Sequence, residues 1–269
     1  VYSFFSGRYL ASLFSLPSSS AETAASSEAV GNWGLGFQKD GTRPTANATI
    51  DELKKYNAHY AADTRKKKIY LTFDCGYENG NTGKILDALK KHHAKATFFM
   101  VGNWVDKYPG SVKKISEAGH EIGSHSNTHP HVTQMSKEKN LEEIKLSASK
   151  IENITQKKIE LYRAPYGEYN DTVIEAANSC EYFAIQWNID TLDYKGNTGE
   201  EMWKRIKPKL KSGAIVLSHN GTKHTADSLD MLIKNIKSEG YELVKVSDLI
   251  YKENYTINSN GTQISLTNE

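Results

Sequence analysis

The chain has 269 residues, of which 38% are hydrophobic and 25% charged, and its formal net charge at pH 7 is +2. This length suits one large α/β domain with extensions, and the composition is that of an ordinary globular protein. A charge so close to neutral argues against a dedicated nucleic-acid-binding protein, because such proteins concentrate Lys and Arg to neutralise phosphates. Two cysteines, Cys75 and Cys180, are too few for a disulfide framework.

The first 67 residues differ in composition from the rest of the chain. Val1–Leu16 is moderately apolar but is interrupted by serines and by Arg8, and it is too short and too polar to span a bilayer. It is either the outer flank of an N-terminal membrane anchor that has been removed, or an amphipathic segment that packs on the domain. Residues 1–30, which end in a Ser/Ala-rich stretch, are predicted to be a flexible segment and linker. Residues 31–67 are predicted to form an irregular arm that packs on the following domain.

From Lys68 onward, short apolar runs alternate with longer amphipathic segments. The runs predict strands at Lys68–Asp74, Ala96–Val101, His120–Ser124, Leu161–Arg163, Tyr182–Ile189, Ala214–Ser218 and Glu242–Lys245. The segments between them predict helices at Thr82–His93, Tyr108–Ala118, Lys137–Ile154, Asn170–Ser179, Gly199–Lys211 and Ala226–Glu239. This alternation predicts an α/β fold with about seven parallel strands over residues 68–252, arranged as a complete or incomplete (β/α) barrel. The tail, residues 253–269, is expected either to add an edge strand or to be disordered.

In parallel α/β barrels the active site lies at the carboxyl ends of the strands. Five of the predicted strands are ended or followed by titratable or charged side chains: Asp74, His125, Arg163, Asp190 with Asp193, and His219. Each residue alone could be a cap or a satisfied surface group. Their joint placement at one rim of the barrel favours a catalytic site.

Two short motifs suggest the chemistry. His125 and His129 are four residues apart, so a single helical turn would point both imidazoles to one side, where they could bind one metal ion. Asp74 could be a metal ligand or a general base. Cys75 could be a thiolate ligand of zinc, or it could be a small buried residue, which is the common fate of a free cysteine.

These residues lie in motifs that resemble those of the polysaccharide deacetylases, also called the NodB-homology or carbohydrate esterase four family. The resemblance covers about Lys68 to Ile250, and the five family motifs appear in order as Thr72-Phe73-Asp74-Cys75-Gly76, His125-Ser126-Asn127-Thr128-His129-Pro130, Arg163-Ala164-Pro165-Tyr166-Gly167, Asp190-Thr191-Leu192-Asp193-Tyr194 and Leu217-Ser218-His219. The family fold is a distorted (β/α) barrel, which agrees with the predicted alternation. Two positions depart from the family pattern: Cys75 replaces a second Asp that usually binds the metal, and Tyr194 replaces a Trp.

The resemblance implies a metal-dependent hydrolase that removes N-acetyl groups. Asp74 would be the general base and His219 the general acid. Arg163 would position Asp74, and Asp193 would tune His219. The remaining implied roles are metal binding by His125 and His129, with Cys75 as an alternative third ligand; oxyanion stabilisation by the backbone N–H of Tyr166; and a pocket wall for the acetyl methyl at Leu217. The implied cofactor is a divalent metal, and a thiolate ligand would favour zinc.

The motifs leave the sugar open. Asp74–Thr82 and Asn32-Trp33-Gly34 resemble the muramic-acid deacetylases that prepare spore cortex, whereas Arg163–Tyr166 is closer to N-acetylglucosamine deacetylases. Both groups act on peptidoglycan, so we expect an extracytoplasmic, monomeric enzyme with glycan strands as its partner and no nucleic acid. The alternatives are a deacetylase of chitin oligomers or acetylxylan, a non-catalytic glycan-binding domain on the same barrel, and another metallohydrolase such as an amidohydrolase or phosphoesterase.

Overall fold

The computed structural model describes residues 67–248, 250–257 and 262–266, together with the backbone of four short strands nearer the N-terminus. These strands are β1 (Leu35–Gly36), β2 (Thr45–Ala46), β3 (Ala58–His59) and β4 (Ala61–Ala62). The predicted flexible segment, residues 1–30, lies outside the described residues, and so does most of the predicted arm, residues 31–67. Within the arm, β1 and β2 form an antiparallel pair, and β3 pairs with the main sheet.

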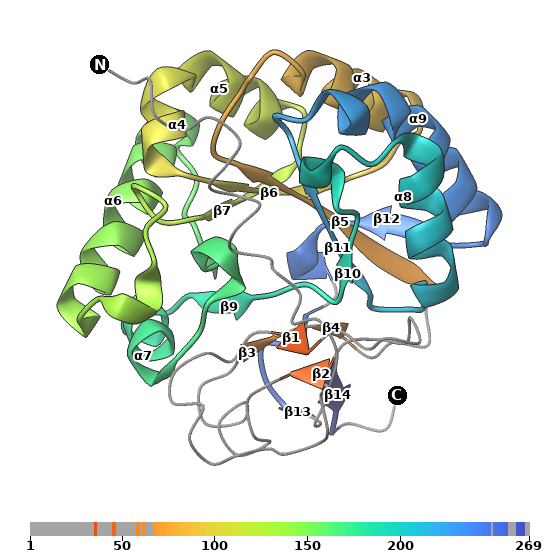
Figure 1. Ribbon diagram of the computed structural model, residues 1–269. Helices are drawn as coiled ribbons and strands as arrows, with labels where there is room; N and C mark the ends of the chain where they lie inside the picture. The colour runs from red at the N-terminus through yellow and green to blue at the C-terminus, as the bar shows by residue number, and fades with distance from the viewer. Residues whose placement is uncertain are drawn as a thin grey trace. The chain divides into compact units, whose positions relative to one another are not determined.

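The main sheet is parallel and curls into an incomplete barrel (Figure 1). Its strands are β5 (Lys68–Cys75), β6 (Thr97–Met100), β7 (Glu121–Ser124), β8 (Leu161–Tyr162), β9 (Phe183–Ile185), β10 (Ile189–Asp190), β11 (Ile215–His219) and β12 (Glu242–Val244). The strand order is β10-β11-β5-β6-β7-β8-β9-β3, and β12 pairs with the first residues of β5. The prediction of a distorted (β/α) barrel of about seven parallel strands is confirmed.

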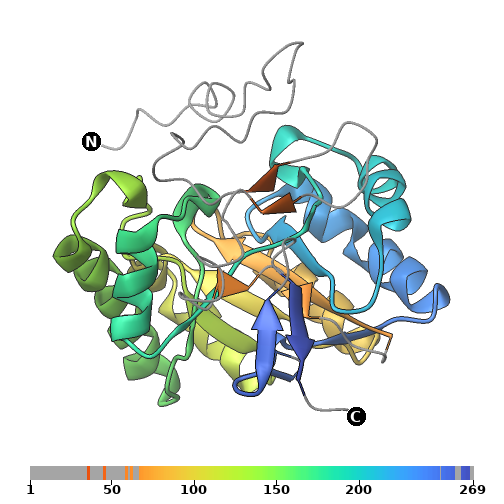
Figure 2. The same cartoon turned by 90° about the horizontal axis from the view of Figure 1, so that it is seen from below.

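Helices surround the sheet on its outer side, as Figures 1 and 2 both show. They are α3 (Thr82–Lys91), α4 (Gly102–Lys107), α5 (Pro109–Glu117), α6 (Lys137–Thr155), α7 (Asp171–Ser179), α8 (Gly199–Ile206) and α9 (Lys223–Ser238). Local sequence explains several of their starts. The side chains of Ser136 and Asn170 accept N-cap hydrogen bonds, and Thr198 forms a capping box with Glu201.

The central strand β5 is buried on both faces, which explains why most of its residues are apolar. Successive side chains of a strand point to opposite faces. Leu71, Phe73 and Cys75 therefore pack in the core between sheet and helices, whereas Tyr70 packs with Phe99, Leu217 and other residues in a second cluster inside the barrel. Full burial of a large apolar side chain contributes about 1.5–3 kcal/mol, so these two clusters hold β5 from both sides. The same alternation turns Asp74 to the barrel interior.

The structure differs from the sequence prediction in two places. The predicted single strand Tyr182–Ile189 is wrong: it is divided into β9 and β10, which lie towards opposite ends of the strand order. The polar Gln186 and Asn188 lie at this break, but the apolar residues around them suggest one strand and do not reveal a change of position in the sheet. Helix α4 was not predicted, because six residues beginning with Gly102 are too few to show a helical period.

The predicted tail contains two strands, β13 (Tyr255–Ile257) and β14 (Thr262–Ser265), which pair antiparallel. Strand β14 also pairs parallel with β4, so a strand near each end of the chain shares one small sheet. The described part of the tail therefore forms strands, but they belong to a small separate sheet and add no edge strand to the main sheet. Among the helices described, none has the length and apolar character needed to cross a membrane.

Candidate active site

Asp74 stands at the carboxyl end of β5 and is almost fully buried. Its Oδ1 accepts a hydrogen bond of 2.8 Å from Nη1 of Arg163, a fully buried residue that directly follows β8. Arg163 is itself fixed, because it also donates to the Thr72 hydroxyl and to the carbonyl oxygens of Ile185 and Gln186. Burial alone would raise the pKa of Asp74, but the charge and hydrogen bond of Arg163, together with His125 and His219, outweigh it and the pKa is lowered. Asp74 is therefore held as a carboxylate inside the barrel.

His125 and His129 come from the loop that follows β7. Their ring centroids lie 4.9 Å apart, and Nε2 of His125 is 3.4 Å from Oδ2 of Asp74. Nδ1 of His125 lies 2.8 Å from the carbonyl oxygen of Arg163, a contact that requires Nδ1 to carry the proton. Burial lowers the pKa of both histidines, to about 3 for His129, so both rings are neutral. The structure thus brings two neutral imidazoles together beside a carboxylate.

His219 and Asp193 form a second pair on the other side of Asp74. His219 ends β11 and lies in register with Asp74 on the adjacent strand. Oδ1 of Asp193 is 2.8 Å from Nδ1 of His219, and Oδ2 of Asp193 accepts the backbone N–H of His219 at 2.7 Å. Burial alone would lower the pKa of His219, but the carboxylates of Asp193, Asp74 and Asp190, above all Asp193, more than offset this and raise the pKa to about 9. His219 therefore carries a proton at neutral pH.

Tyr166 and Leu217 lie at the same end of the barrel. Leu217 is buried in β11, two residues before His219. Tyr166 has φ 58° and ψ 3°, a left-handed conformation that costs a residue with a side chain about 1 kcal/mol or more. Ser126, His129 and Leu192 in the neighbouring loops also have positive φ. Such strained residues are typical of active sites, where the surrounding structure holds them in place.

Cys75 lies apart from these groups. It is fully buried in the apolar core between sheet and helices, and its Sγ lies 3.9 Å from the carbonyl oxygen of Phe73. Burial raises the pKa of the thiol well above its usual value. Of the two readings left open by the sequence, this placement favours a small buried residue over a thiolate ligand.

Several positioning residues were not recognised in the sequence. The hydroxyls of Thr222 and Thr225, at the start of α9, both donate to Oδ2 of Asp193. Glu143 of α6 accepts the backbone N–H groups of Asn127 and Thr128 at 2.8 and 2.7 Å, which fixes the loop between the two histidines. Nothing local in the sequence marks these residues, because each acts on a partner at least 15 residues away.

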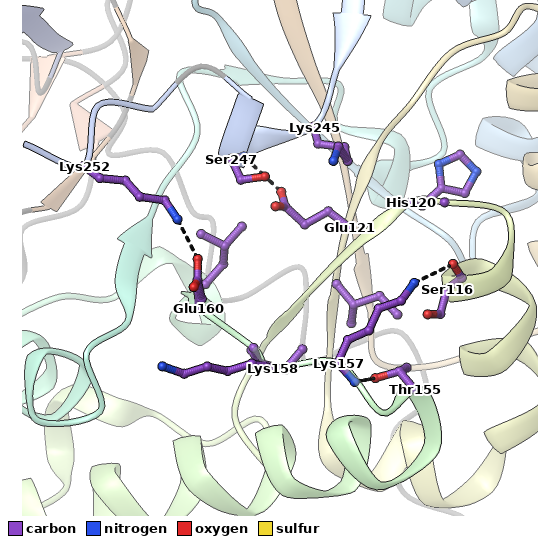
Figure 3. Close-up of a pocket in the computed structure, with 14 residues that line it drawn as sticks. Ser116, His120, Glu121, Thr155, Lys157, Lys158, Glu160, Lys245, Ser247 and Lys252 are labelled. Carbon is purple, nitrogen blue, oxygen red and sulfur yellow. Dashed lines mark hydrogen bonds and ion pairs between the residues drawn. The ribbon is translucent and has the colours of Figure 1, made fainter.

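A polar cavity of about 530 Å³ lies elsewhere, at the amino ends of β7 and β8 (Figure 3). Two of the lysines that line it make contacts that stabilise the fold. Lys157 donates to the carbonyl oxygen of Ser116 in the last turn of α5, and Lys252 pairs with Glu160 at 2.7 Å. Cations at helix C-termini offset the negative end of the helix dipole. We therefore assign the chemistry to the carboxyl ends of the strands and not to this cavity.

The comparisons with known proteins agree with this site. A family model described as polysaccharide deacetylase matches residues 61–185. Peptidoglycan-N-acetylmuramic acid deacetylase PdaA of Bacillus subtilis is 35% identical over 243 residues, which cover 86% of this chain and 91% of that protein. The chain belongs to the polysaccharide deacetylase family. The solved structure of PdaA, a family 4 carbohydrate esterase, superposes with a TM-score of 0.74 and 32% identity over 81% of this chain and 95% of that one.

Two further relatives show that this family contains both enzymes and a protein without activity. Peptidoglycan-N-acetylglucosamine deacetylase PgdA of Listeria monocytogenes is 39% identical over 183 residues, or 68% of this chain and 39% of that protein. A solved pseudoenzyme of the CE4 family from Bacillus anthracis superposes with a TM-score of 0.69 and 28% identity, over 80% of this chain and 88% of that one. The barrel alone therefore does not make an enzyme, and the groups inside it must be judged individually.

The family implies a divalent metal, and the donors in this structure fit one in part. Nε2 of neutral His125 and Oδ2 of Asp74 are both acceptors, so their approach to 3.4 Å is favourable only if a proton or a cation lies between them. His129 supplies a second imidazole. Within the described residues, however, no three His, Cys, Asp or Glu side chains converge as a complete metal site.

Proposed function

We propose that this protein is a metal-dependent peptidoglycan N-deacetylase, and that it acts outside the cytoplasm on amino sugars of the glycan strands. The observation that carries the proposal is the pair Asp74 and His219, which lie in register on adjacent strands and are held in opposite states of protonation. Amide hydrolysis requires both a base for the attacking water and an acid for the leaving amine. A site that only binds glycan, without cleaving a bond, requires neither group.

Asp74 is the general base of this proposal. Its carboxylate stays ionised because Arg163 lowers its pKa, and Arg163 also fixes its orientation through a 2.8 Å hydrogen bond. In this state Asp74 can accept a proton from water at neutral pH. Arg163 has further partners in Thr72 and in the backbone, so it holds Asp74 without itself moving a proton.

His219 is the general acid. A free amine is a poor leaving group, and the leaving nitrogen must be protonated as the C–N bond breaks. Asp193 holds Nδ1 of His219 at 2.8 Å and keeps the ring charged, which leaves Nε2 to deliver the proton. Tyr194, the aromatic residue that stands where the family usually has Trp, lies edge to face with the same ring at 5.3 Å between centroids.

His125 and His129 would hold the metal, with Asp74 beside them as the nearby carboxylate, and we propose zinc because imidazole is a preferred zinc ligand. When bound, a divalent ion supplies Lewis acidity, which polarises a carbonyl and lowers the pKa of water. The backbone N–H of Tyr166 is the proposed donor to the oxyanion, and Leu217 is the proposed wall for the acetyl methyl. A preorganised donor of this kind typically contributes a factor of 10² or more to the rate.

Peptidoglycan is the proposed substrate because PdaA and PgdA, which this chain resembles over most of the barrel, are both named as peptidoglycan deacetylases. One is named for N-acetylmuramic acid and the other for N-acetylglucosamine, and we propose that the sugar attacked is one of these two. Chitin oligomers and acetylxylan are the alternative substrates. Peptidoglycan lies outside the membrane, which gives the proposed location.

The test is acetate release from purified glycan strands by the full chain, before and after chelation and again after zinc is restored. We expect release that chelation abolishes and zinc restores, and mass spectrometry of the products then identifies the sugar. His125→Ala is expected to abolish release, and His92→Ala, which removes an imidazole far from the site, is the matched control. No release from any acetylated glycan with any divalent metal would refute the enzyme and favour a glycan-binding domain on the same barrel.

A further inference from the structure

The turn that presents the Tyr166 backbone is strained and needs support. Tyr166 and Gly167 are consecutive left-handed residues, with φ 58° and 69°. The turn is closed by two backbone hydrogen bonds, from Gly167 to Ala164 and from Glu168 to Pro165. Because Tyr166 carries a side chain, this conformation is unfavourable by itself and persists only when surrounding contacts fix it.

One side of the turn rests on the barrel wall. The Gln186 amide donates to the carbonyl oxygen of Gly167 at 3.0 Å. A side chain at Gly167 would meet the Trp187 ring at 2.7 Å, so the backbone is packed directly on this wall. These contacts hold Gly167, but they do not hold the Tyr166 ring.

The Tyr166 ring is held from the other side by the loop after β7. It stacks on the ring of His131, with centroids 4.5 Å apart and planes 14° apart, and it lies edge to face with His129 at 4.5 Å. His131 is fixed in turn by Glu168, whose Oε1 is 2.7 Å from Nδ1 of His131. The other oxygen of Glu168 accepts from the Thr133 hydroxyl at 3.2 Å.

Glu168 is the residue that directly follows the strained turn. Its two contacts therefore connect the loop after β7 to the loop after β8, with the Tyr166 ring packed against the connection. A connection of this kind between two loops reduces the freedom of both, and it places the Tyr166 ring in one position relative to His129.

We propose that the His131–Glu168 pair is a brace that fixes the Tyr166 ring and thereby keeps the Tyr166 backbone N–H directed into the active site. His131 and Glu168 are positioning residues in this proposal, and neither touches the reacting atoms. The proposal rests on the function proposed above, because the N–H of Tyr166 assists catalysis only if an acyl group is attacked beside it.

The first test measures the brace without using activity. Amide hydrogen exchange is followed by mass spectrometry in the full chain and in His131→Ala and Glu168→Ala. We expect the hydrogen-bonded amides of Gly167 and Glu168 to exchange about tenfold faster or more in both variants, because local opening becomes easier. Peptides around Asp193 and His219 should not change. Glu168→Gln, which keeps the shape of the side chain, is the milder variant if either alanine variant folds poorly.

The second test measures the consequence for catalysis. We expect His131→Ala to lower kcat about tenfold with KM within about twofold, since an oxyanion donor acts mainly in the transition state. The double variant should lose no more than the worse single variant, because both changes remove one brace. His92→Ala, which breaks an equally short pair with Asp230 at 2.7 Å, is the matched control and should leave both constants unchanged.

Unchanged exchange in the 164–169 segment of both variants would overturn the brace, whether or not the wild-type protein releases acetate. Faster exchange with a raised KM and an unchanged kcat would overturn the link to the oxyanion, and it would make His131 a substrate-binding residue. If the wild-type protein releases no acetate, the proposed function fails, and the exchange result still decides whether the brace exists.

Discussion

At the scale of single residues, the site holds two neighbouring groups, Asp74 and His219, in opposite protonation states. Asp74 is buried and the His219 side chain is only 20% exposed, and removal from water disfavours the charged form of each. Neighbouring charges together reverse this effect in both cases, and the largest contributions come from Arg163 for the carboxylate and from Asp193 for the imidazole. Titratable groups whose environments move their pKa values apart are typical of an acid and base that act together.

The pH dependence of kcat/KM should report the ionisation of His219 beside Asp193. The acid is protonated below its pKa of about 9 and is lost as the pH rises through this value, so kcat/KM should fall on a basic limb near pH 9. Asp193→Asn removes the charge that opposes burial, and the limb should move down towards the ordinary histidine value of 6.5 or below it. Profiles from pH 5 to 10 measure the shift, with Asp248→Asn at an exposed ion pair as the control. A limb that stays in place would show that another group sets it.

Removing either of the two groups proposed to transfer protons should lower activity much more than a change of pH does. Asp74→Asn keeps the size of the side chain but cannot accept the proton of water, and His219→Ala removes the acid. Each variant is expected to lower kcat by about 100-fold or more. Acetate release at pH 7 under saturating substrate gives the measurement. Activity within tenfold of wild type in either variant would contradict the assigned role.

At the scale of elements, the alternation of β5 decides which side chains enter the site. Asp74 and Cys75 are adjacent in sequence, yet one faces the barrel interior and the other the core beneath the helices. The sequence predicted the motif but left the fate of Cys75 open, because neither the exact end of a strand nor a twist at its end can be deduced from a run of apolar residues.

Cys75→Ala separates the two readings of this residue. If the thiol is only a buried group, the variant should bind zinc with unchanged stoichiometry and keep its turnover within about twofold. The free energy of unfolding should fall by about 1 kcal/mol, as expected for the loss of one buried heavy atom. Metal analysis after dialysis and urea unfolding give the two numbers. Loss of zinc with retained stability would instead show that Cys75 is a ligand.

The sequence predicted the elements better than their arrangement. Most strand and helix positions follow from their periods, and the helix predicted over Asn170–Ser179 lies within one residue of α7, whose N-cap is Asn170. The division between β9 and β10 was missed, although the polar Gln186 and Asn188 stand between the two strands. The contacts that hold the site, such as Glu143 with the His125–His129 loop and Glu168 with His131, join loops that meet only in the folded barrel. No local period encodes such meetings.

At the scale of the whole domain, a small sheet joins the N-terminal arm to the C-terminal tail. Strand β14 pairs with β4 from the N-terminal arm and with β13, so the arm and the tail stabilise each other. The link from this small sheet to the chain that leaves the barrel is Gln263. Its buried amide donates to the carbonyl oxygen of Tyr251 and accepts the backbone N–H of the same residue, both at 2.8 Å.

Gln263→Ala should therefore lower the free energy of unfolding by about 2–3 kcal/mol. The change removes two hydrogen bonds to Tyr251, each worth about 0.5–1.5 kcal/mol, together with the buried side chain that makes them. Urea unfolding followed by circular dichroism gives the value, with Gln134→Ala at an exposed position as the control. A loss below about 0.5 kcal/mol would mean that the small sheet is not coupled to the barrel through Gln263, since surface substitutions change stability by no more than this.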